Sequence, residues 1–263
     1  MKRSETPSGL DVRLMNAAAV VLFVVFVLAC ALALTRWIAS NKVFAFQGIT
    51  VIGDVSHCNT ATVRAHVVSR VKGTFFSMDL GSTRDAFEAI PWVRKAVVHR
   101  DFPNHLRVKL QEHQVVAYWG DDSEQRLLNS YGEVFDANAG EVEQYNLPRL
   151  NGPPSQSAGV LAAYRLIEPQ FSALNLTIET LELSVQGSWR IALVGGALIE
   201  AGRGDGEALA HRTQAFLKTL SRVVARYSRP LGALETADLR HENGYAIRLR
   251  GVSTLAAANA PTP

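Results

Sequence analysis

The chain has few cysteines and lacks the common catalytic motifs, and both absences limit the classes of function that it can have. Two of its 263 residues are cysteines, and Cys30 lies inside a long apolar run, so Cys58 has no disulfide partner. His57 precedes Cys58, but no second group of ligands stands at a metal-binding spacing. No Gly-x-Ser-x-Gly elbow, His-Glu-x-x-His pair or phosphate-binding glycine loop is present. We therefore expect no catalytic residue, no metal and no cofactor.

The chain also lacks the excess of positive charge that nucleic-acid binding requires. It carries 27 Lys and Arg against 24 Asp and Glu, but residues 1–42 hold five of the basic and two of the acidic residues. The remainder therefore carries 22 charges of each sign. A nucleic-acid footprint needs its basic excess on the globular part, so we expect no nucleic-acid partner.

The most distinctive stretch present is AAAVVLFVVFVLACALAL, residues 17–34, which has no charge, proline or glycine. As a helix it is about 27 Å long, which with flanking apolar residues covers a hydrocarbon core of about 30 Å. A cleaved signal peptide is the competing interpretation, but the apolar core of a signal peptide usually runs about 7–15 residues. We predict an uncleaved transmembrane helix over residues 17–39, surrounded by membrane lipid.

The flanking charges and the length of the following segment predict the orientation of this helix. Lys2, Arg3 and Arg13 precede it and Arg36 and Lys42 follow it, so the positive-inside rule favours a cytoplasmic N-terminus. No second apolar run brings the chain back across the membrane. We expect a cytoplasmic tail over residues 1–16 and about 220 residues outside the cytoplasm.

Residues 40–114 predict a small α+β domain in the order strand, helix, helix, strand, strand. Residues 46–51 are rich in β-branched side chains, as in a strand. Asn59 or Thr60 caps a helix to about Ser69, and Ser82 or Thr83 caps a second one over residues 84–89. The period then changes to two, which predicts a hairpin.

The hairpin is predicted to turn at residues 103–105, so that Phe102 pairs with Leu106. One face then carries the apolar side chains and covers a core, while the other face is mostly polar. The predicted core face consists of Ala96, Val98, Phe102, Leu106, Val108 and Leu110.

Beyond Trp119 the segments are short and strand-like, with two helices between them. Ser157 is predicted to cap a helix over residues 159–171, in which Leu166 belongs to the apolar side. Residues 178–201 read as a meander. Asp205 caps a long helix over residues 207–227, and two more strand segments follow, the last at residues 245–249.

Three motifs together resemble the FtsQ/DivIB family of bacterial division proteins. Two of them are Gly-Arg-Gly-Asp at residues 202–205 and Asp-Leu-Arg at 238–240 with Asn243-Gly244. The longest is Pro91-Trp92-Val93 followed by Val98-x-Arg100-x-Phe102-Pro103-x-x-Leu106-x-Val108-x-Leu110-x-Glu112 and Ala117-x-Trp119. The resemblance implies a POTRA domain over residues 40–114, a β-rich α+β domain over 115–250 and, with the anchor, a single-pass inner-membrane protein. We expect residues 251–263, small and polar with two prolines, to be disordered.

The last strand is the candidate functional site. It precedes the predicted disordered tail, so we expect it at a sheet edge, where unpaired N–H and C=O groups accept a partner's strand. The resemblance implies that this strand and the turn before it receive the periplasmic part of FtsB, which arrives with its coiled-coil partner FtsL. The alternative is that Tyr245 and Ile247 simply pack the core. The predicted partner-binding residues are His241, Asn243, Gly244, Tyr245, Ile247 and Leu249.

These features predict a non-catalytic scaffold at the division septum that binds FtsB, FtsL and other divisome proteins and influences septal peptidoglycan synthesis. A POTRA-bearing chaperone of outer-membrane protein assembly or secretion is one alternative, but it would normally need a membrane barrel or tandem POTRA domains. An anchored periplasmic enzyme with an unfamiliar site is the other.

Overall fold

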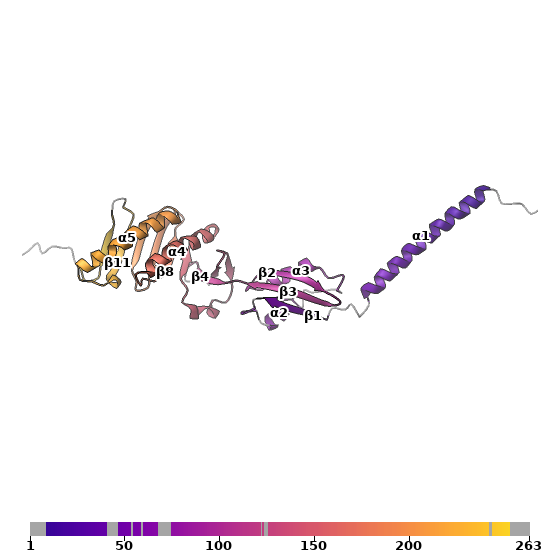
Figure 1. Cartoon of the computed structure of the whole chain (residues 1–263), viewed down its shortest axis with the longest axis horizontal. Helices are drawn as coiled ribbons and strands as arrows, with labels where there is room; N and C mark the ends of the chain where they lie inside the picture. Colours follow the sequence, from indigo (N-terminus) through magenta and orange to yellow (C-terminus); the bar gives the residue numbers. More distant parts are fainter. Residues whose placement is uncertain are drawn as a thin grey trace, which may run out of the picture. The chain divides into compact units, whose positions relative to one another are not determined.

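A computed structural model describes residues 9–40, 47–53, 55–58, 60–67, 75–121, 123, 126–241 and 244–252. The chain divides into two compact units, Met1–Glu112 and His113–Pro263 (Figure 1). The first contains a long helix followed by a three-stranded sheet with two helices, and the second contains a nine-stranded sheet with two helices. The fold class predicted from the sequence, an apolar helix followed by an α+β domain and a β-rich α+β domain, is confirmed.

Helix α1 (Gly9–Ser40) contains the predicted membrane span. Among the described residues it is the one helix long and apolar enough to cross a membrane, from Val12 to Trp37, and none of its most apolar window is buried within the protein. The absence of burial distinguishes α1 from a core helix, which would pack its apolar side chains against other elements.

The first unit has the predicted order of elements. These are β1 (Gly48–Gly53), α2 (Thr60–Val67), α3 (Leu80–Glu88), β2 (Val93–Asp101) and β3 (His105–Glu112). Strand β3 lies in the middle of the sheet, parallel to β1 and antiparallel to β2. Leu106, Val108 and Leu110 are buried on one face, and Arg107 and Lys109 between them are exposed, so the sheet covers a core on one side as expected. The predicted cap at Asn59 and helix end at Ser69 lie outside the described residues.

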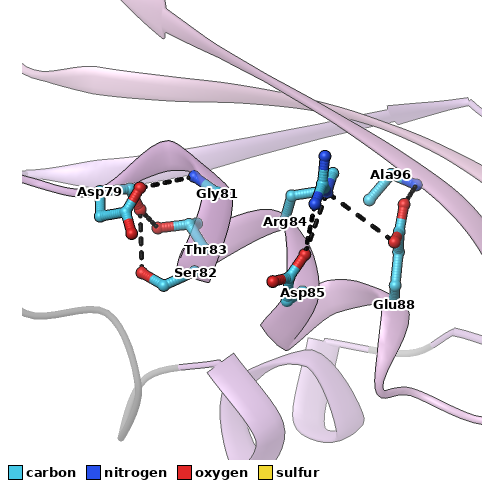
Figure 2. Close-up of polar contacts among 8 residues, drawn as sticks. All are labelled: Asp79, Gly81, Ser82, Thr83, Arg84, Asp85, Glu88 and Ala96. Carbon is cyan, nitrogen blue, oxygen red and sulfur yellow. Dashed lines mark hydrogen bonds and ion pairs between the residues drawn. The ribbon is translucent and has the colours of Figure 1, made fainter.

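The second helix of this unit begins four residues earlier than predicted, and its cap is Asp79. The Asp79 carboxylate accepts a hydrogen bond from the backbone N–H of Gly81 at 2.8 Å (Figure 2). Ser82 and Thr83 instead donate their hydroxyls to the Asp79 carbonyl, at 3.1 and 2.7 Å. The prediction of a Ser82 or Thr83 cap was wrong because Asp79 satisfies the first free N–H groups before either hydroxyl is reached.

The β2–β3 pairing differs from the predicted register by two residues. Asp101 pairs with His105 and Arg100 with Leu106, so the turn is formed by residues 102–104 and is centred on Pro103. A shift of two residues leaves each side chain on its predicted face, because side chains alternate with period two. Phe102 is the exception: it lies in the turn and is 73% exposed, so its assignment to the core face was wrong.

The second unit is built on one mixed sheet of nine strands, in the order β12-β11-β10-β9-β8-β7-β4-β5-β6. Helices α4 (Ser157–Ser172) and α5 (Gly206–Arg226) pack against each other, α4 on β7 and β8 and α5 on β10 (Figure 1). The strands are β4 (Val115–Trp119), β5 (Arg126–Asn129), β6 (Val134–Asp136), β7 (Arg149–Asn151), β8 (Ile178–Leu183), β9 (Ser188–Leu193), β10 (Leu198–Arg203), β11 (Leu234–Asp238) and β12 (Ala246–Leu249).

The apolar core lies between this sheet and the two helices. It includes Phe171 of α4, Ile191 of β9 and Phe216 of α5, each at most 1% exposed. Leu166, predicted on the apolar side of α4, is 48% exposed, because the buried side of the helix follows Val160, Ala163, Ile167 and Phe171. The second unit is therefore a single layer of helices on a single sheet.

The two predicted helix caps of this unit have different outcomes. Asp205 caps α5 as predicted, accepting from the backbone N–H of Ala208 at 2.8 Å. Ser157 does not cap α4: it is the first helical residue, and its hydroxyl donates to the carbonyl of Gly132 at 2.7 Å. The Ser157 hydroxyl thus bonds to a residue 25 positions away instead of capping the helix locally.

Candidate functional site

Strand β12 lies at the end of the nine-stranded sheet, where the sequence predicted an edge. It pairs antiparallel with β11, Asp238 opposite Ala246 and Thr236 opposite Arg248, and no strand among the described residues pairs with its other side. An edge of this kind presents a row of main-chain groups to solvent.

The outward main-chain groups of β12 belong to its odd-numbered residues. Arg250 donates its N–H to the carbonyl of Ala233 at 2.8 Å, so the even-numbered residues of this segment face β11. Hydrogen-bonding groups alternate between the two sides of a strand. The N–H and C=O of Tyr245 and Ile247 therefore face away from β11, toward the open edge.

The side chains of the same strand alternate between the core and the opposite face of the sheet. Leu249 is 5% exposed and belongs to the core, and Tyr245 and Ile247 are half-buried against it. Ala246 and Arg248 are exposed. The Tyr245 and Ile247 side chains therefore pack against the core, as the alternative expected, while their main-chain groups face away from β11.

Tyr245 fixes the start of β12 to α5. Its ring meets the Phe216 ring edge to face, with 5.0 Å between centroids, and its hydroxyl lies 2.6 Å from the hydroxyl of Thr219. At the other end, Arg229 donates to the carbonyl of Gly251 at 2.7 Å. Both ends of β12 are thus held in place. This lowers the conformational entropy that β12 would lose when a partner strand pairs with it.

The remaining predicted residues lie in the turn before β12. His241 and Gly244 are exposed, and Asn243 lies outside the described residues. A Cβ added at Gly244 would meet no atom within 4 Å, and its φ is not in the left-handed region. The fold itself therefore gives no steric reason for a glycine there, and the open space is available to another chain.

Two cavities adjoin this turn, and Arg212 of α5 lines both of them. The larger, of about 660 Å³, lies against Arg203, Arg212, Arg240 and His241, and the smaller, of about 290 Å³, against Arg212, His241, Gly244 and Tyr245. The Nε and Nη2 atoms of Arg212 are buried without a hydrogen-bond partner among the described residues. Arg212 nevertheless lines both cavities, and the positive charge of its guanidinium favours a carboxylate in this space.

The structure brings the two shorter sequence motifs together at the larger cavity. Gly202 has a φ of +79°, and a Cβ there would lie 3.3 Å from Cγ of Arg240. The N–H of Leu239 donates to the carbonyl of Glu200 at 2.8 Å. The positive φ therefore favours glycine at position 202, and Arg240 leaves little room for a side chain there.

Arg240 is itself held by Asp238, the last residue of β11. The guanidinium donates to both carboxylate oxygens, at 2.9 and 2.6 Å. These bonds, with the backbone N–H of Arg240, lower the pKa of Asp238 to about 2. At neutral pH Asp238 is therefore ionised and forms an ion pair with Arg240.

Sequence reasoning missed Arg212, Ala246 and Arg248. Arg212, Ala215, Phe216 and Thr219 follow the i, i+3, i+4, i+7 spacing of one helical face, and this spacing could have placed Arg212 beside the last strand. Ala246 and Arg248 could have been found from the alternation of the strand once its inward residues were known.

Comparisons with known proteins agree with this architecture. Residues 44–113 match the family model of the FtsQ-type POTRA domain, and residues 117–240 match that of the cell division protein FtsQ/DivIB C-terminal region. A cell division protein FtsQ of Burkholderia pseudomallei is 39% identical over 93% of this chain and 96% of its own length. Those of Thiomonas arsenitoxydans and Bordetella pertussis are 34% and 33% identical, over 92% and 91% of this chain and 89% and 92% of their own lengths.

Proposed function

Because the chain belongs to the FtsQ/DivIB family of cell division proteins, we propose that it is a non-catalytic scaffold of the division septum that receives FtsB on the open edge of β12. FtsL arrives with FtsB as its coiled-coil partner, other divisome proteins join them, and the complex influences septal peptidoglycan synthesis. The N-terminus is cytoplasmic and both globular domains, residues 40–114 and 115–250, are periplasmic.

One observation carries this proposal: β12 ends its sheet with the N–H and C=O of Tyr245 and Ile247 directed outward. A partner strand that adds here forms main-chain hydrogen bonds with those groups. Ala246 and Arg248 provide exposed side chains that select the partner sequence. Leu249 takes part through its backbone, because its side chain is in the core.

The basic cavities beside the edge support an acidic partner segment. Arg203, Arg212, Arg240 and His241 surround space that opens next to the turn before β12, and two of the Arg212 donor atoms lack partners among the described residues. We expect the FtsB segment to place an acidic side chain there while its strand pairs with β12. Its carboxylate would then form an ion pair with the guanidinium groups that line the cavity, among them that of Arg212.

Photocrosslinking in dividing cells tests the proposal. A photoreactive amino acid is introduced at Arg248, which is exposed on the β12 edge, and as a matched control at Asp136, which is exposed on the strand at the other end of the sheet. We expect a crosslink to FtsB from position 248 and none from position 136, with both variants present at the septum.

Two outcomes would contradict the proposal. Equal crosslinking of FtsB from both positions would show that β12 is not the docking edge. Septal localisation without any FtsB crosslink from position 248, or from position 246 as a second probe on the same strand, would show that the chain acts at the septum through another surface.

A further inference from the structure

One end of the first unit's sheet carries two exposed aromatic side chains. Phe102, in the β2–β3 turn, is 73% exposed, and Phe76, in the segment before α3, is 48% exposed. Both are connected through the buried ring of Phe75, whose centroid lies 5.2 Å from that of Phe76 and 6.2 Å from that of Phe102. Singly scattered exposed aromatics are ordinary, whereas a cluster marks an interaction surface.

Phe75, Phe76 and Phe102 together form an aromatic tip, and hydrogen bonds from Arg100 of β2 hold the segment that carries Phe75 and Phe76. The guanidinium of Arg100 donates to the carbonyls of Phe75 at 2.9 Å and Met78 at 2.7 Å. Phe75 and Met78 are 4% and 3% exposed. The two exposed rings therefore lie against a buried and hydrogen-bonded segment.

The aromatic tip lies at the end of the sheet where the chain arrives from the membrane helix. The N–H of Gln47 donates to the carbonyl of Asn104 at 3.0 Å, and Gly48 pairs with His105. Strand β1 thus begins beside the β2–β3 turn. Its far end, where Gly53 pairs with Leu110, lies near the end of β3 that leads to the second unit.

The length of chain between the anchor and β1 limits how far the tip can be from the bilayer. Seven residue steps separate Ser40, the last residue of α1, from Gln47, and a fully extended chain covers at most about 25 Å in that number of steps. Ser40 lies three helical residues, about 4.5 Å, beyond the end of the span at Trp37. The turn is therefore tethered within about 30 Å of the bilayer surface.

We propose that the aromatic tip is a membrane-contacting surface: Phe76 and Phe102 insert into the headgroup region of the bilayer that α1 spans. This inference rests on α1 spanning the membrane and does not depend on FtsB binding at β12. Exposed Phe side chains gain free energy by burying their apolar rings at the boundary of headgroups and acyl chains, and the short tether makes the contact intramolecular, with a high effective concentration. Insertion would orient the first domain relative to the membrane.

Fluorescence quenching by brominated phospholipids tests this in the full chain reconstituted in lipid nanodiscs. Trp37 is replaced by phenylalanine to remove the anchor's own signal, and Phe102→Trp introduces a reporter at the tip. Trp92, Trp119 and Trp189 are at most 5% exposed, so they contribute a constant background. The matched control is Ile52→Trp, because Ile52 is 43% exposed near the far end of β1. Circular dichroism confirms that both variants are folded.

We expect brominated lipid to quench the tip reporter at least about twofold more strongly than the control reporter. Equal quenching of the two reporters, or none at either, would overturn the proposal. A tip reporter that is shielded from iodide in water but not quenched by brominated lipid would also overturn it, because a protein or a second copy of the chain would then cover the tip.

Discussion

Two strands of the second unit, β12 and β6, have one side without a pairing strand among the described residues, and their surroundings differ. Strand β6 has three residues and is followed by the short helices η2 (Ala139–Glu141) and η3 (Glu143–Tyr145). Acidic residues gather on this segment: Glu133, Asp136, Glu141 and Glu143. Short length and charge are common devices that protect an edge from unwanted pairing.

Strand β12 is only one residue longer, but its surroundings differ. It is fixed to α5 through Tyr245 and adjoins basic cavities lined by Arg212, two of whose donor atoms have no partner among the described residues. Both edges present outward main-chain groups. What distinguishes β12 is that its start is fixed to α5 and that basic cavities adjoin it, and on these two features we propose it as the docking edge.

The largest expected effect on FtsB binding is that of a proline in β12, with a proline in β6 as the matched control. Ile247→Pro removes an outward N–H of β12. On β6, the bond from the Asn129 N–H to the Glu133 carbonyl shows that the main-chain groups of odd-numbered residues face β5. The N–H of Val134 therefore faces outward, and Val134→Pro removes an outward N–H of β6. Neither change removes a bond to the neighbouring strand, so both proteins should fold. We expect Ile247→Pro to weaken binding of the periplasmic FtsB segment about 10- to 100-fold, because one main-chain hydrogen bond is lost and a carbonyl of the partner strand is left without a donor, and Val134→Pro to leave it unchanged.

Calorimetry of the full chain in detergent with the FtsB segment measures both affinities. If the two proline variants bind equally well, the distinction between the edges is wrong. A lower unfolding temperature in either variant would be seen by scanning calorimetry of the same samples and would separate loss of fold from loss of binding.

The second effect concerns the charge beside β12. Arg212→Met keeps the aliphatic stem but removes the unpaired donors, whereas Lys218→Met on the exposed side of α5 removes a charge that no described cavity uses. We expect Arg212→Met to weaken FtsB binding about tenfold. Its unfolding temperature in the absence of FtsB should equal or exceed that of the wild type, because an unsatisfied buried group is relieved. A less stable Arg212→Met protein with unchanged affinity would show that Arg212 only supports the fold.

A smaller effect is expected from the open space at Gly244. A Cβ added at Gly244 meets nothing within 4 Å among the described residues, and Gly232→Val provides a control because a Cβ at Gly232 also meets nothing within 4 Å. We expect Gly244→Val to weaken FtsB binding roughly fivefold, about 1 kcal/mol, with no change in unfolding temperature. Equal affinities of the two variants would place the partner farther from the turn.

Much of the fold was predictable because it follows from local patterns. The alternation of Leu106, Val108 and Leu110 specified the core face of β3, and Asp205 specified the start of α5. The errors came from contacts between distant segments. Ser157 does not cap α4, because its hydroxyl bonds to Gly132 instead. Phe102 is not in the core, because the turn begins one residue earlier than predicted. Such competition is decided by tertiary structure, which periodicity does not encode.

The candidate site also has features that the sequence predicted and features that it did not. The edge position of the last strand followed from its place before a polar tail, whereas the order of the other strands across the sheet could not be anticipated. The direction of the main-chain groups of β12 depended on its register with β11, and the cavity beside it depended on α5 returning across the sheet to bring Arg212 next to His241. Neither the register nor the helix crossing can be read from the spacing of residues in the sequence.

Amide hydrogen exchange tests the central claim most directly, because it reports each main-chain N–H of β12 separately. When the periplasmic FtsB segment is added to the full chain, we predict that the amides of Tyr245 and Ile247 become protected, while those of Val134 and Asp136 on β6 exchange as before. Binding of FtsB without new protection at Tyr245 and Ile247 would contradict strand addition at this edge.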